Sequence, residues 1–133
     1  HAIVVLGIND IRNRRGLAEE VVTAQQLMDG LNQMARRARD RGIKLFGGTL
    51  SPFENETFMQ GAWTSEGEAK RIALNEWIRT SGAFDAVIDF DAGLRDPSHP
   101  TQMQPIYDNG DHLHPGDVGY NRMGDLIDLS LFD

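Results

Sequence analysis

Three short apolar runs, separated by segments with helical periodicity, constrain the fold of this 133-residue chain more than any other feature. The runs are 2–6 (AIVVL), 43–46 (IKLF) and 86–90 (AVIDF), and each is followed by glycine or aspartate. Runs of this length, bounded by residues that favour turns, are typical of β-strands. We therefore expect three strands at these positions.

The segments between and after these runs have the periodicity of amphipathic helices. Apolar residues recur at steps of three and four over 17–38, and again over 69–78. Ser65 and Glu68 have the spacing of a capping box ahead of the second pattern. A last helix is expected near 115–127, because its first residue is a proline, which suits the first helical position.

Strands that alternate with helices predict a parallel sheet, because parallel strands need a crossover connection between them. Strands that are almost continuously apolar also indicate burial on both faces of the sheet. We therefore expect an α/β fold with three layers, in which helices cover both faces. The length, with 40% hydrophobic and 25% charged residues, suits one domain over 1–133.

The net charge of -7 argues against a nucleic-acid partner, because a polyanion would be repelled. Arginines do gather along two stretches, which on helices usually form a solvated face: Arg12, Arg14, Arg15, Arg36, Arg37, Arg39 and Arg41. No apolar stretch approaches the roughly 18 residues of a membrane-spanning helix. We expect neither nucleic-acid binding nor a membrane span.

The absence of cysteine excludes disulfides, a thiol nucleophile and thiolate metal sites. It suits a cytoplasmic protein and an exported bacterial protein alike, so the compartment stays open, with a secreted bacterial protein the expectation we favour. Residues 1–6 lack the basic start and long apolar core of a signal peptide. A chain that begins at His1 inside an apolar run also suggests a trimmed or incomplete N-terminus.

Chemistry is expected beyond the carboxyl ends of the strands, where open parallel sheets bind ligands. The segments 7–10 (GIND), 47–53 and 89–114 follow the three strands there. Asn9 lies in the first, and a side-chain N–H at this edge can stabilise the negative oxygen that develops in acyl transfer. The alternative is that Asn9 and Asp10 only turn the chain after a strand.

The sequence Asp111-His112-Leu113-His114-Pro115 is the second candidate site. Residues three apart in a turn can approach each other, so Asp111 can accept from one ring nitrogen of His114 and leave the other as a base. The alternative is that Asp111 caps a turn and His114 is a half-exposed histidine. For His112 we expect a structural role.

A metal site is a further alternative, since histidine and carboxylate ligands together suit zinc and similar ions. The candidate ligands are Asp111, His112, His114 and Asp117. Adjacent ligands that point in alternating directions rarely converge on one ion, and the acidic residues between 85 and 96 lack the spacing of a calcium loop. We therefore expect no metal and no cofactor.

Together, the blocks 7–10 (GIND) and 111–115 (DHLHP) resemble the asparagine and histidine blocks of the SGNH (GDSL-type) ester hydrolase superfamily. The segments 47–53, 67–71 and 87–91 look like bacterial esterases of this superfamily in the same order. The resemblance implies a flavodoxin-like α/β/α fold and serine-dependent acyl transfer. It implies His114 as general base, Asp111 as its orienting partner and Asn9 as an oxyanion donor, with a lipid, short acyl ester or acetylated sugar as substrate.

The chain departs from the superfamily by lacking the G-D-S block with the nucleophile and the block with the oxyanion glycine. None of its serines lies in G-D-S or G-x-S-x-G: Ser51, Ser65, Ser81, Ser98 and Ser130. Ser51 is the nearest in position, but this segment is a structural loop in the superfamily. We therefore expect the nucleophile in an upstream segment, with an inactive remnant that binds a partner as the alternative.

Without an upstream neighbour, the strand at 2–6 would be an apolar edge of the sheet. We expect this edge to pair with an N-terminal fragment of the same protein or with a second copy of the chain. Gly7, Phe58 and Trp63 are further candidates for substrate contacts. For the two aromatic residues, the alternative is that they cover the edge of the core.

Overall fold

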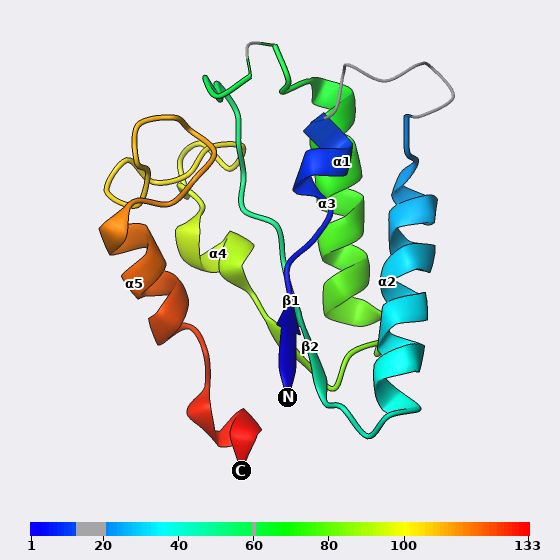
Figure 1. Ribbon diagram of the computed structural model, residues 1–133. Coiled ribbons are helices and arrows are strands. Elements are labelled where there is room, and N and C mark those ends of the chain that lie inside the picture. The colour runs from blue at the N-terminus through cyan, green and yellow to red at the C-terminus, as the bar shows by residue number, and fades with distance from the viewer. Residues whose placement is uncertain (13–20, 60) are drawn as a thin grey trace.

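A three-stranded parallel sheet forms the centre of the computed structural model, which describes residues 1–12, 21–59 and 61–133 (Figure 1). The strands are β1 (Ala2–Val4), β2 (Leu45–Gly48) and β3 (Ala86–Ile88), in the order β1-β2-β3. The register places Ile3 opposite Phe46 and Gly47 opposite Val87. The predicted parallel sheet is confirmed, although β1 and β3 are shorter than the apolar runs that predicted them.

Helices connect the strands and follow the last one. They are α1 (Ile8–Arg12), α2 (Ala24–Arg39), α3 (Ser65–Thr80), α4 (Phe90–Leu94) and α5 (Asp117–Asp125), with a 3-10 helix η2 (Leu129–Phe132) at the C-terminal end. The long helices α2 and α3 cross over between consecutive strands, as parallel pairing requires. None of the helices in the described ranges is long and apolar enough to cross a membrane.

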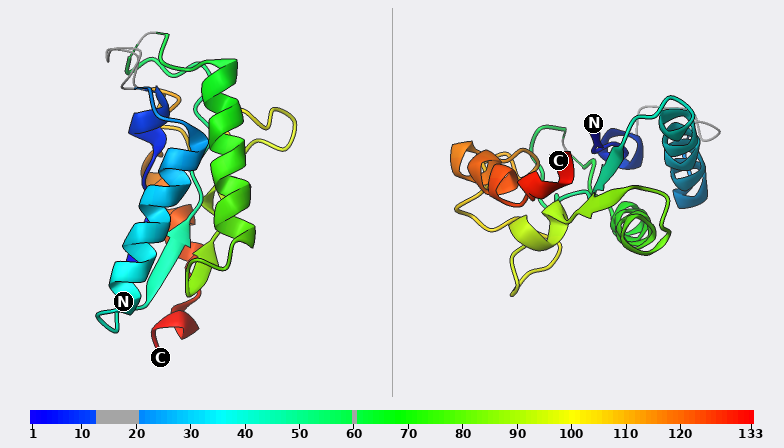
Figure 2. Two further views of the ribbon diagram at one scale, coloured as in Figure 1. Left: turned by 90° about the vertical axis from the view of Figure 1, so that its right-hand side faces the viewer. Right: turned by 90° about the horizontal axis from the view of Figure 1, so that it is seen from below.

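Two sets of buried side chains divide the fold into three layers. On one face of the sheet, Leu45 packs with Leu31 of α2 and Leu74 of α3. On the other face, Phe46 and Ile88 pack with residues of α5 and η2. Seen from below, the sheet lies between α2 and α3 on one side and α5 with the C-terminal segment on the other (Figure 2). The expected three-layer α/β architecture is confirmed.

Burial is uneven across the sheet. All four residues of β2 are buried, because this strand has a neighbour on each side and a helical layer over each face. Ile3 of β1 and Val87 of β3 are each 38% exposed. The expected burial of every strand on both faces is therefore wrong for the outer strands, because the helices cover the centre of the sheet more fully than its edges.

The strand β2 ends in two glycines because aromatic rings occupy the space over both of its faces. A Cβ on Gly47 would lie 2.5 Å from the ring of Phe84, and one on Gly48 would lie 2.7 Å from the ring of Phe90. Both distances are too short for carbon atoms in contact. The missing side chains let the segments before and after β3 pack directly against the central strand.

The start of α2 differs from the prediction. The pattern over 17–38 becomes a helix that begins after Thr23, whose side chain accepts a hydrogen bond from the backbone N–H of Gln26. The Gln26 side chain accepts from the Thr23 N–H in return, which completes a capping box. Leu17, where the pattern begins, lies outside the described residues.

The cap of α3 also differs from the prediction. Ser65 is the first residue of the helix, and Thr64 caps it by accepting from the backbone N–H of Gly67. Glu68 does not complete a capping box, because the residue three positions after the Thr64 cap is Gly67. The carboxylate of Glu68 binds Arg71 instead.

The segment after β3 forms an unpredicted helix. The strand predicted over 86–90 ends at Ile88, because the Asp89 side chain accepts from the backbone N–H of Ala92 and caps α4. The last helix begins at Asp117, two residues after Pro115, and η2 follows it.

A buried ionic network joins α3, α4 and the loop after β2. Arg71 is 1% exposed and donates to Glu68 at 2.6 Å, to Asp91 at 2.6 Å and to the carbonyl oxygen of Leu50 at 2.8 Å. Asn75, one turn further along α3, donates to the same carbonyl at 2.8 Å and accepts from the Leu50 N–H at 2.7 Å. Side chains of α3 therefore hold both backbone polar groups of Leu50.

The segments that follow the strands leave the same edge of the sheet, at the top of Figure 1. They are α1 after β1, the loop that starts at Thr49 after β2, and α4 with the loop beyond it after β3. This is the edge where the sequence predicts a site.

Replacing Arg71 by methionine is expected to lower the free energy of unfolding by about 3–5 kcal/mol, because Glu68 and Asp91 would lose a buried partner. Arg95→Met is the matched control. Arg95 binds the same Asp91, but its side chain is 38% exposed, so the loss should be about 1 kcal/mol or less. Urea unfolding followed by circular dichroism measures both losses, and equal losses would contradict the prediction.

Asp89 is expected to make stability depend on pH. Burial raises the pKa of its carboxyl, but hydrogen bonds from Arg79, Ala92 and Thr49 outweigh burial and lower the pKa from 3.8 to about 2. The charged form therefore stabilises the fold above about pH 4, and this contribution is lost as the pH falls from about 4 to about 2. Asp89→Asn keeps an oxygen to cap α4. The difference in urea midpoint between the protein and this variant should shrink over that range, and a constant difference would refute the prediction.

Candidate active site

Asn9 lies in α1, the short helix that follows β1. Gly7 makes the preceding turn with a φ of 127°, a conformation that favours glycine, and a Cβ there would lie 3.1 Å from Leu74. The segment for which a simple turn was the alternative is thus a helix, and it carries Asn9 at the edge of the sheet. The Asn9 side chain is exposed, and its Oδ1 accepts from Arg12 Nη1 at 3.2 Å.

Asp111 and His114 meet in the loop before α5. The Oδ2 of Asp111 lies 2.7 Å from Nδ1 of His114. Its Oδ1 accepts from the backbone N–H groups of Leu113 at 2.9 Å and of His114 at 2.8 Å. The spacing of three residues therefore brings carboxylate and imidazole together, as the sequence predicts. When Nδ1–H donates to Asp111, a neutral ring has its free lone pair on Nε2, the nitrogen that can act as a base.

The loop also keeps Asp111 charged. Burial by itself raises the pKa of the Asp111 carboxyl. Hydrogen bonds from the His114 ring and from the N–H groups of His114 and Leu113 outweigh burial and hold the pKa well below its usual value. An ionised Asp111 can orient the imidazole and stabilise the imidazolium ion that forms when Nε2 takes a proton.

Asn9 and His114, which come from opposite ends of the sequence, line one cavity of about 240 Å³. The other residues that line it are Val5, Ile8, Leu50, Ser51 and Leu113. A hollow with mostly apolar walls and a few polar groups is the usual form of a small-molecule site. The structure therefore brings together an amide donor and an oriented imidazole, the two groups that the sequence selects.

Arg12 and Glu56 are the residues near this site that sequence reasoning missed. Arg12 is 5% exposed, and its Nη2 lies 2.8 Å from Oε2 of Glu56, so its assignment to a solvated face is wrong. The available signal was its position one helical turn after Asn9. Of the other arginines in the two stretches, those at 36, 37, 39 and 41 are exposed as expected, and those at 14 and 15 lie outside the described residues.

The remaining candidates occupy different places. Ser51 is half-buried in the wall of the cavity. Phe58 is 66% exposed. Its ring and the imidazole ring of His114 meet edge to face, with 5.4 Å between the ring centroids. Trp63 packs against the main core, and Gly7 lines a separate hollow beside α2. Substrate contact stays a prediction for Phe58, Trp63 and Gly7, and only Phe58 touches the histidine.

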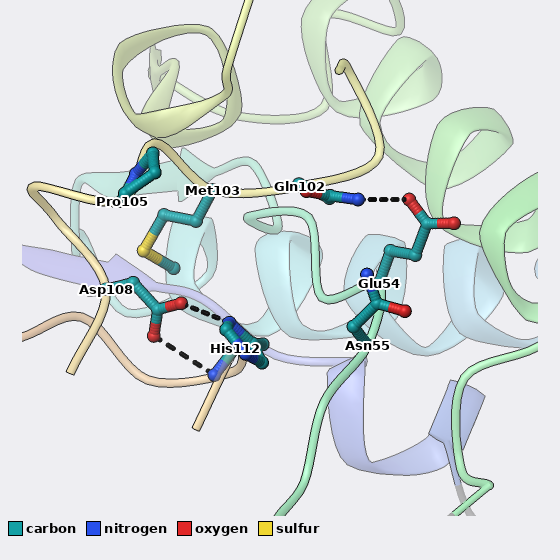
Figure 3. Close-up of a pocket in the computed structure, with 7 residues that line it drawn as sticks. All are labelled: Glu54, Asn55, Gln102, Met103, Pro105, Asp108 and His112. Carbon is teal, nitrogen blue, oxygen red and sulfur yellow. Dashed lines mark hydrogen bonds and ion pairs between the residues drawn. The ribbon is translucent and has the colours of Figure 1, made fainter. Parts of the chain in front are cut away.

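A second aspartate–histidine pair lines a separate cavity of about 90 Å³ (Figure 3). The Nδ1 of His112 lies 2.5 Å from Oδ2 of Asp108, whose Oδ1 accepts from the N–H groups of Gly110 and His112. Glu54 and Gln102 form part of the same cavity wall (Figure 3). Both oxygens of Asp108 are thus used to hold the loop, a structural arrangement of the kind expected for His112.

In the portion of the chain that the structure describes, no three histidine, aspartate or glutamate side chains are grouped as ligands of a metal ion. His112 and His114 line different cavities, so the four candidate ligands between 111 and 117 do not converge on one point.

Comparisons with known proteins agree with the fold. The model of the GDSL-like lipase/acylhydrolase family matches residues 1–122. A GDSL-like lipase from Bacteroides thetaiotaomicron is similar in structure, with a TM-score of 0.80 at 19% sequence identity, and a putative acylhydrolase from Bacteroides fragilis has a TM-score of 0.77 at 18%. A comparison with curated protein sequences finds no match.

Each structural match covers 98% of this chain but only 60% of the other protein, so the chain spans about three fifths of the length of these relatives. At sequence identities below 20%, these structural similarities are evidence for the fold alone. The family model, in contrast, matches the sequence from His1 almost to the end of α5 and includes both the Asn9 and the His114 blocks. The chain belongs to the GDSL-like lipase/acylhydrolase family.

Proposed function

We propose that the chain supplies the general base and an oxyanion donor of a serine ester hydrolase. The observation that carries the proposal is the common cavity of Asn9 and His114, with Asp111 bonded to the far side of the imidazole. These are the groups that acyl transfer needs besides a nucleophile.

In the proposed reaction, a serine Oγ attacks the ester carbonyl carbon and passes its proton to Nε2 of His114. The carbonyl oxygen becomes negative and accepts a hydrogen bond from Nδ2 of Asn9. The C–O bond to the alcohol then breaks, and His114 returns the proton to the leaving oxygen. Water repeats the sequence on the acyl-serine, which releases the acid and restores the serine. Asp111 keeps the imidazole oriented and stabilises it while it is protonated.

We propose that the serine belongs to another segment, which pairs with the open edge of β1. Within the described residues β1 lies at the edge of the sheet, and Ile3, Val5 and Leu6 on it or just after it are 38%, 39% and 54% exposed. Apolar sheet edges favour pairing with a further strand. The chain together with the segment that supplies the serine is called the complete enzyme below.

The substrate class is proposed as an ester, in keeping with the family. The mostly apolar walls of the cavity suit an acyl chain or a small ester better than a highly charged one. Export from a bacterial cell stays a prediction that no structural observation addresses.

In the complete enzyme, His114→Ala is expected to lower ester hydrolysis by at least about 10³-fold, because the residues of a catalytic triad act as a unit. His99→Ala is the matched control. His99 also lies beside an aspartate, with 3.7 Å between Nδ1 and Oδ2 of Asp96, but its side chain is 67% exposed and away from the cavity. The control should keep nearly full activity, and an unchanged rate in His114→Ala would refute the assignment.

A labelling experiment on the same proteins locates the nucleophile. The proteins are treated with a fluorophosphonate, which labels activated serines, and the intact mass of each chain is then measured. An adduct on a segment outside this chain, slowed in His114→Ala, would support the proposal. An adduct lost in Ser51→Ala would place the nucleophile in this chain and overturn that part of it. No adduct and no turnover would favour an inactive member of the family that binds a partner.

Pairing through β1 is expected to be sensitive to proline at Ile3. The Ala2 N–H donates to the carbonyl oxygen of Lys44, the residue before β2, and since N–H groups alternate along a strand, the Ile3 N–H faces the open edge. Ile3→Pro should therefore block an added strand and leave the β2 ladder intact. Light scattering is expected to show the unchanged chain in a complex with the serine segment or as a self-associated species.

Ile3→Pro should shift this species towards a monomer, whereas Ile106→Pro, in an exposed loop, should not. A monodisperse monomer of the unchanged chain would contradict pairing at this edge.

A further inference from the structure

Arg12 connects Asn9 to the loop that follows β2. It is the last residue of α1, three positions after Asn9, and its guanidinium is buried. It donates to Oδ1 of Asn9 at 3.2 Å and to Oε2 of Glu56 at 2.8 Å. Its central carbon also lies 5.4 Å from the centroid of the Phe58 ring. One side chain thus contacts the candidate oxyanion donor and two residues of a loop far away in the sequence.

The contact with Arg12 decides which way the Asn9 amide faces. An asparagine side chain carries an acceptor oxygen and a donor nitrogen that exchange places when its last torsion turns by about 180°. Arginine can only donate, so the oxygen of Asn9 must face Arg12 and the NH₂ group must point away from it. A hydrogen bond from a cation to the amide oxygen also polarises the amide, which strengthens the donor at its other end.

Glu56 holds Arg12 in this place. The side chains of Arg12 and Glu56 are 6% and 0% exposed, so the two charges form a buried pair. Oε2 of Glu56 also accepts from the N–H of Met59 at 3.2 Å, which ties the carboxylate to its own loop. A buried charge that loses its partner is strongly destabilising, so this pair restricts the guanidinium to one position.

The same loop reaches the histidine side of the site. The Thr57 N–H donates to the carbonyl oxygen of Asp111 at 2.9 Å, and the Phe58 ring packs against His114. Residues 56–58 therefore contact both Arg12, which holds Asn9, and the loop that holds the Asp111–His114 pair. The geometry links the oxyanion donor and the base through one three-residue segment.

We propose that Arg12, held by Glu56, is a positioning residue that keeps the NH₂ group of Asn9 directed into the cavity shared with His114. The proposal rests on the function proposed above, because it concerns the donor that would stabilise the oxyanion. Arg12 acts through Asn9 and does not itself line the cavity.

The test is a double-mutant cycle in the complete enzyme. Arg12→Lys keeps the charge beside Glu56 but removes the planar fork that serves two acceptors at once. It is expected to lower kcat about tenfold with KM changed less than about twofold, since the lost contact acts on the transition state. Arg95→Lys, in a half-exposed ion pair of α4, is the matched control and should leave kcat unchanged.

Asn9→Ala is expected to lower kcat by about 10²-fold to 10³-fold, the loss seen for a single oxyanion donor. If Arg12 acts through Asn9, then Arg12→Lys should have no further effect on kcat in the Asn9→Ala background. The same tenfold loss in both backgrounds would show a general structural role and overturn the proposal, as would an unchanged kcat in Arg12→Lys alone.

The two proposals fail in different ways. If Asn9→Ala leaves kcat unchanged, the oxyanion role is refuted, and the positioning role with it. If Asn9→Ala lowers kcat but the effects of the two substitutions multiply, only the positioning role is refuted.

A spectroscopic measurement on the same proteins does not depend on turnover. The side-chain NH₂ resonances of Asn9, assigned by their loss in Asn9→Ala, are expected to shift and broaden in Arg12→Lys and to stay unchanged in Arg95→Lys. Glu56→Gln, which keeps an acceptor oxygen but removes the charge, should give a smaller change in the same direction. Asn9 resonances that are identical in Arg12→Lys and the unchanged enzyme would contradict the proposal.

Discussion

The shape of the cavity depends on one buried guanidinium, that of Arg71. Burial by itself lowers the pKa of this group, but its bonds to Glu68 and Asp91 outweigh burial and raise the pKa above the ordinary value, so Arg71 stays charged. Its remaining hydrogen bond goes to the carbonyl of Leu50, a residue of the cavity wall. Asp91 also accepts a hydrogen bond from Arg79, with 2.7 Å between Nη2 of Arg79 and Oδ2 of Asp91, so Arg79 belongs to the same network. The chain that leaves β2 therefore has little freedom where it borders the site.

The helix α3 is the common reference for the two elements that flank the cavity. It holds the loop after β2 through Arg71 and Asn75. It also packs against α1 and the turn before it, because Leu74 lies against Gly7 of that turn and Gly67 lies against Ile11 of α1. Because both elements pack against the same helix, α3 fixes the position of Asn9 relative to Leu50. The loop after β2 in turn reaches the histidine loop through Thr57. A rigid element that supports several loops is the usual way in which an α/β fold gives a site a definite geometry.

Local patterns in the sequence predict what local physics decides. The apolar runs predict the three strands, and the spacing of Asp111 and His114 predicts their contact, since each depends on neighbours within a few residues. The burial of Arg12 was not predictable in this way, because it depends on Glu56, a residue far along the chain. The end of β3 was missed because the side chain of Asp89 caps a helix at a position where apolar composition favours a strand. Long-range charge pairs and competing caps are thus the features that composition and periodicity leave open.

The two aspartate–histidine pairs show why a short motif alone does not identify a base. The pair of Asp108 with His112 is as close as the pair of Asp111 with His114, and each aspartate also accepts backbone N–H groups. Both rings are therefore oriented, and hydrogen bonding alone does not distinguish them. What differs is the cavity that each imidazole lines. His114 shares a cavity of about 240 Å³ with Asn9, whereas His112 lines one of about 90 Å³ in which the amide of Gln102 already donates to Glu54. A general base in acyl transfer needs a place where the reacting carbonyl can meet both the base and an oxyanion donor. Of the two cavities, the larger one beside His114 and Asn9 suits that need better, which supports the proposed role of His114.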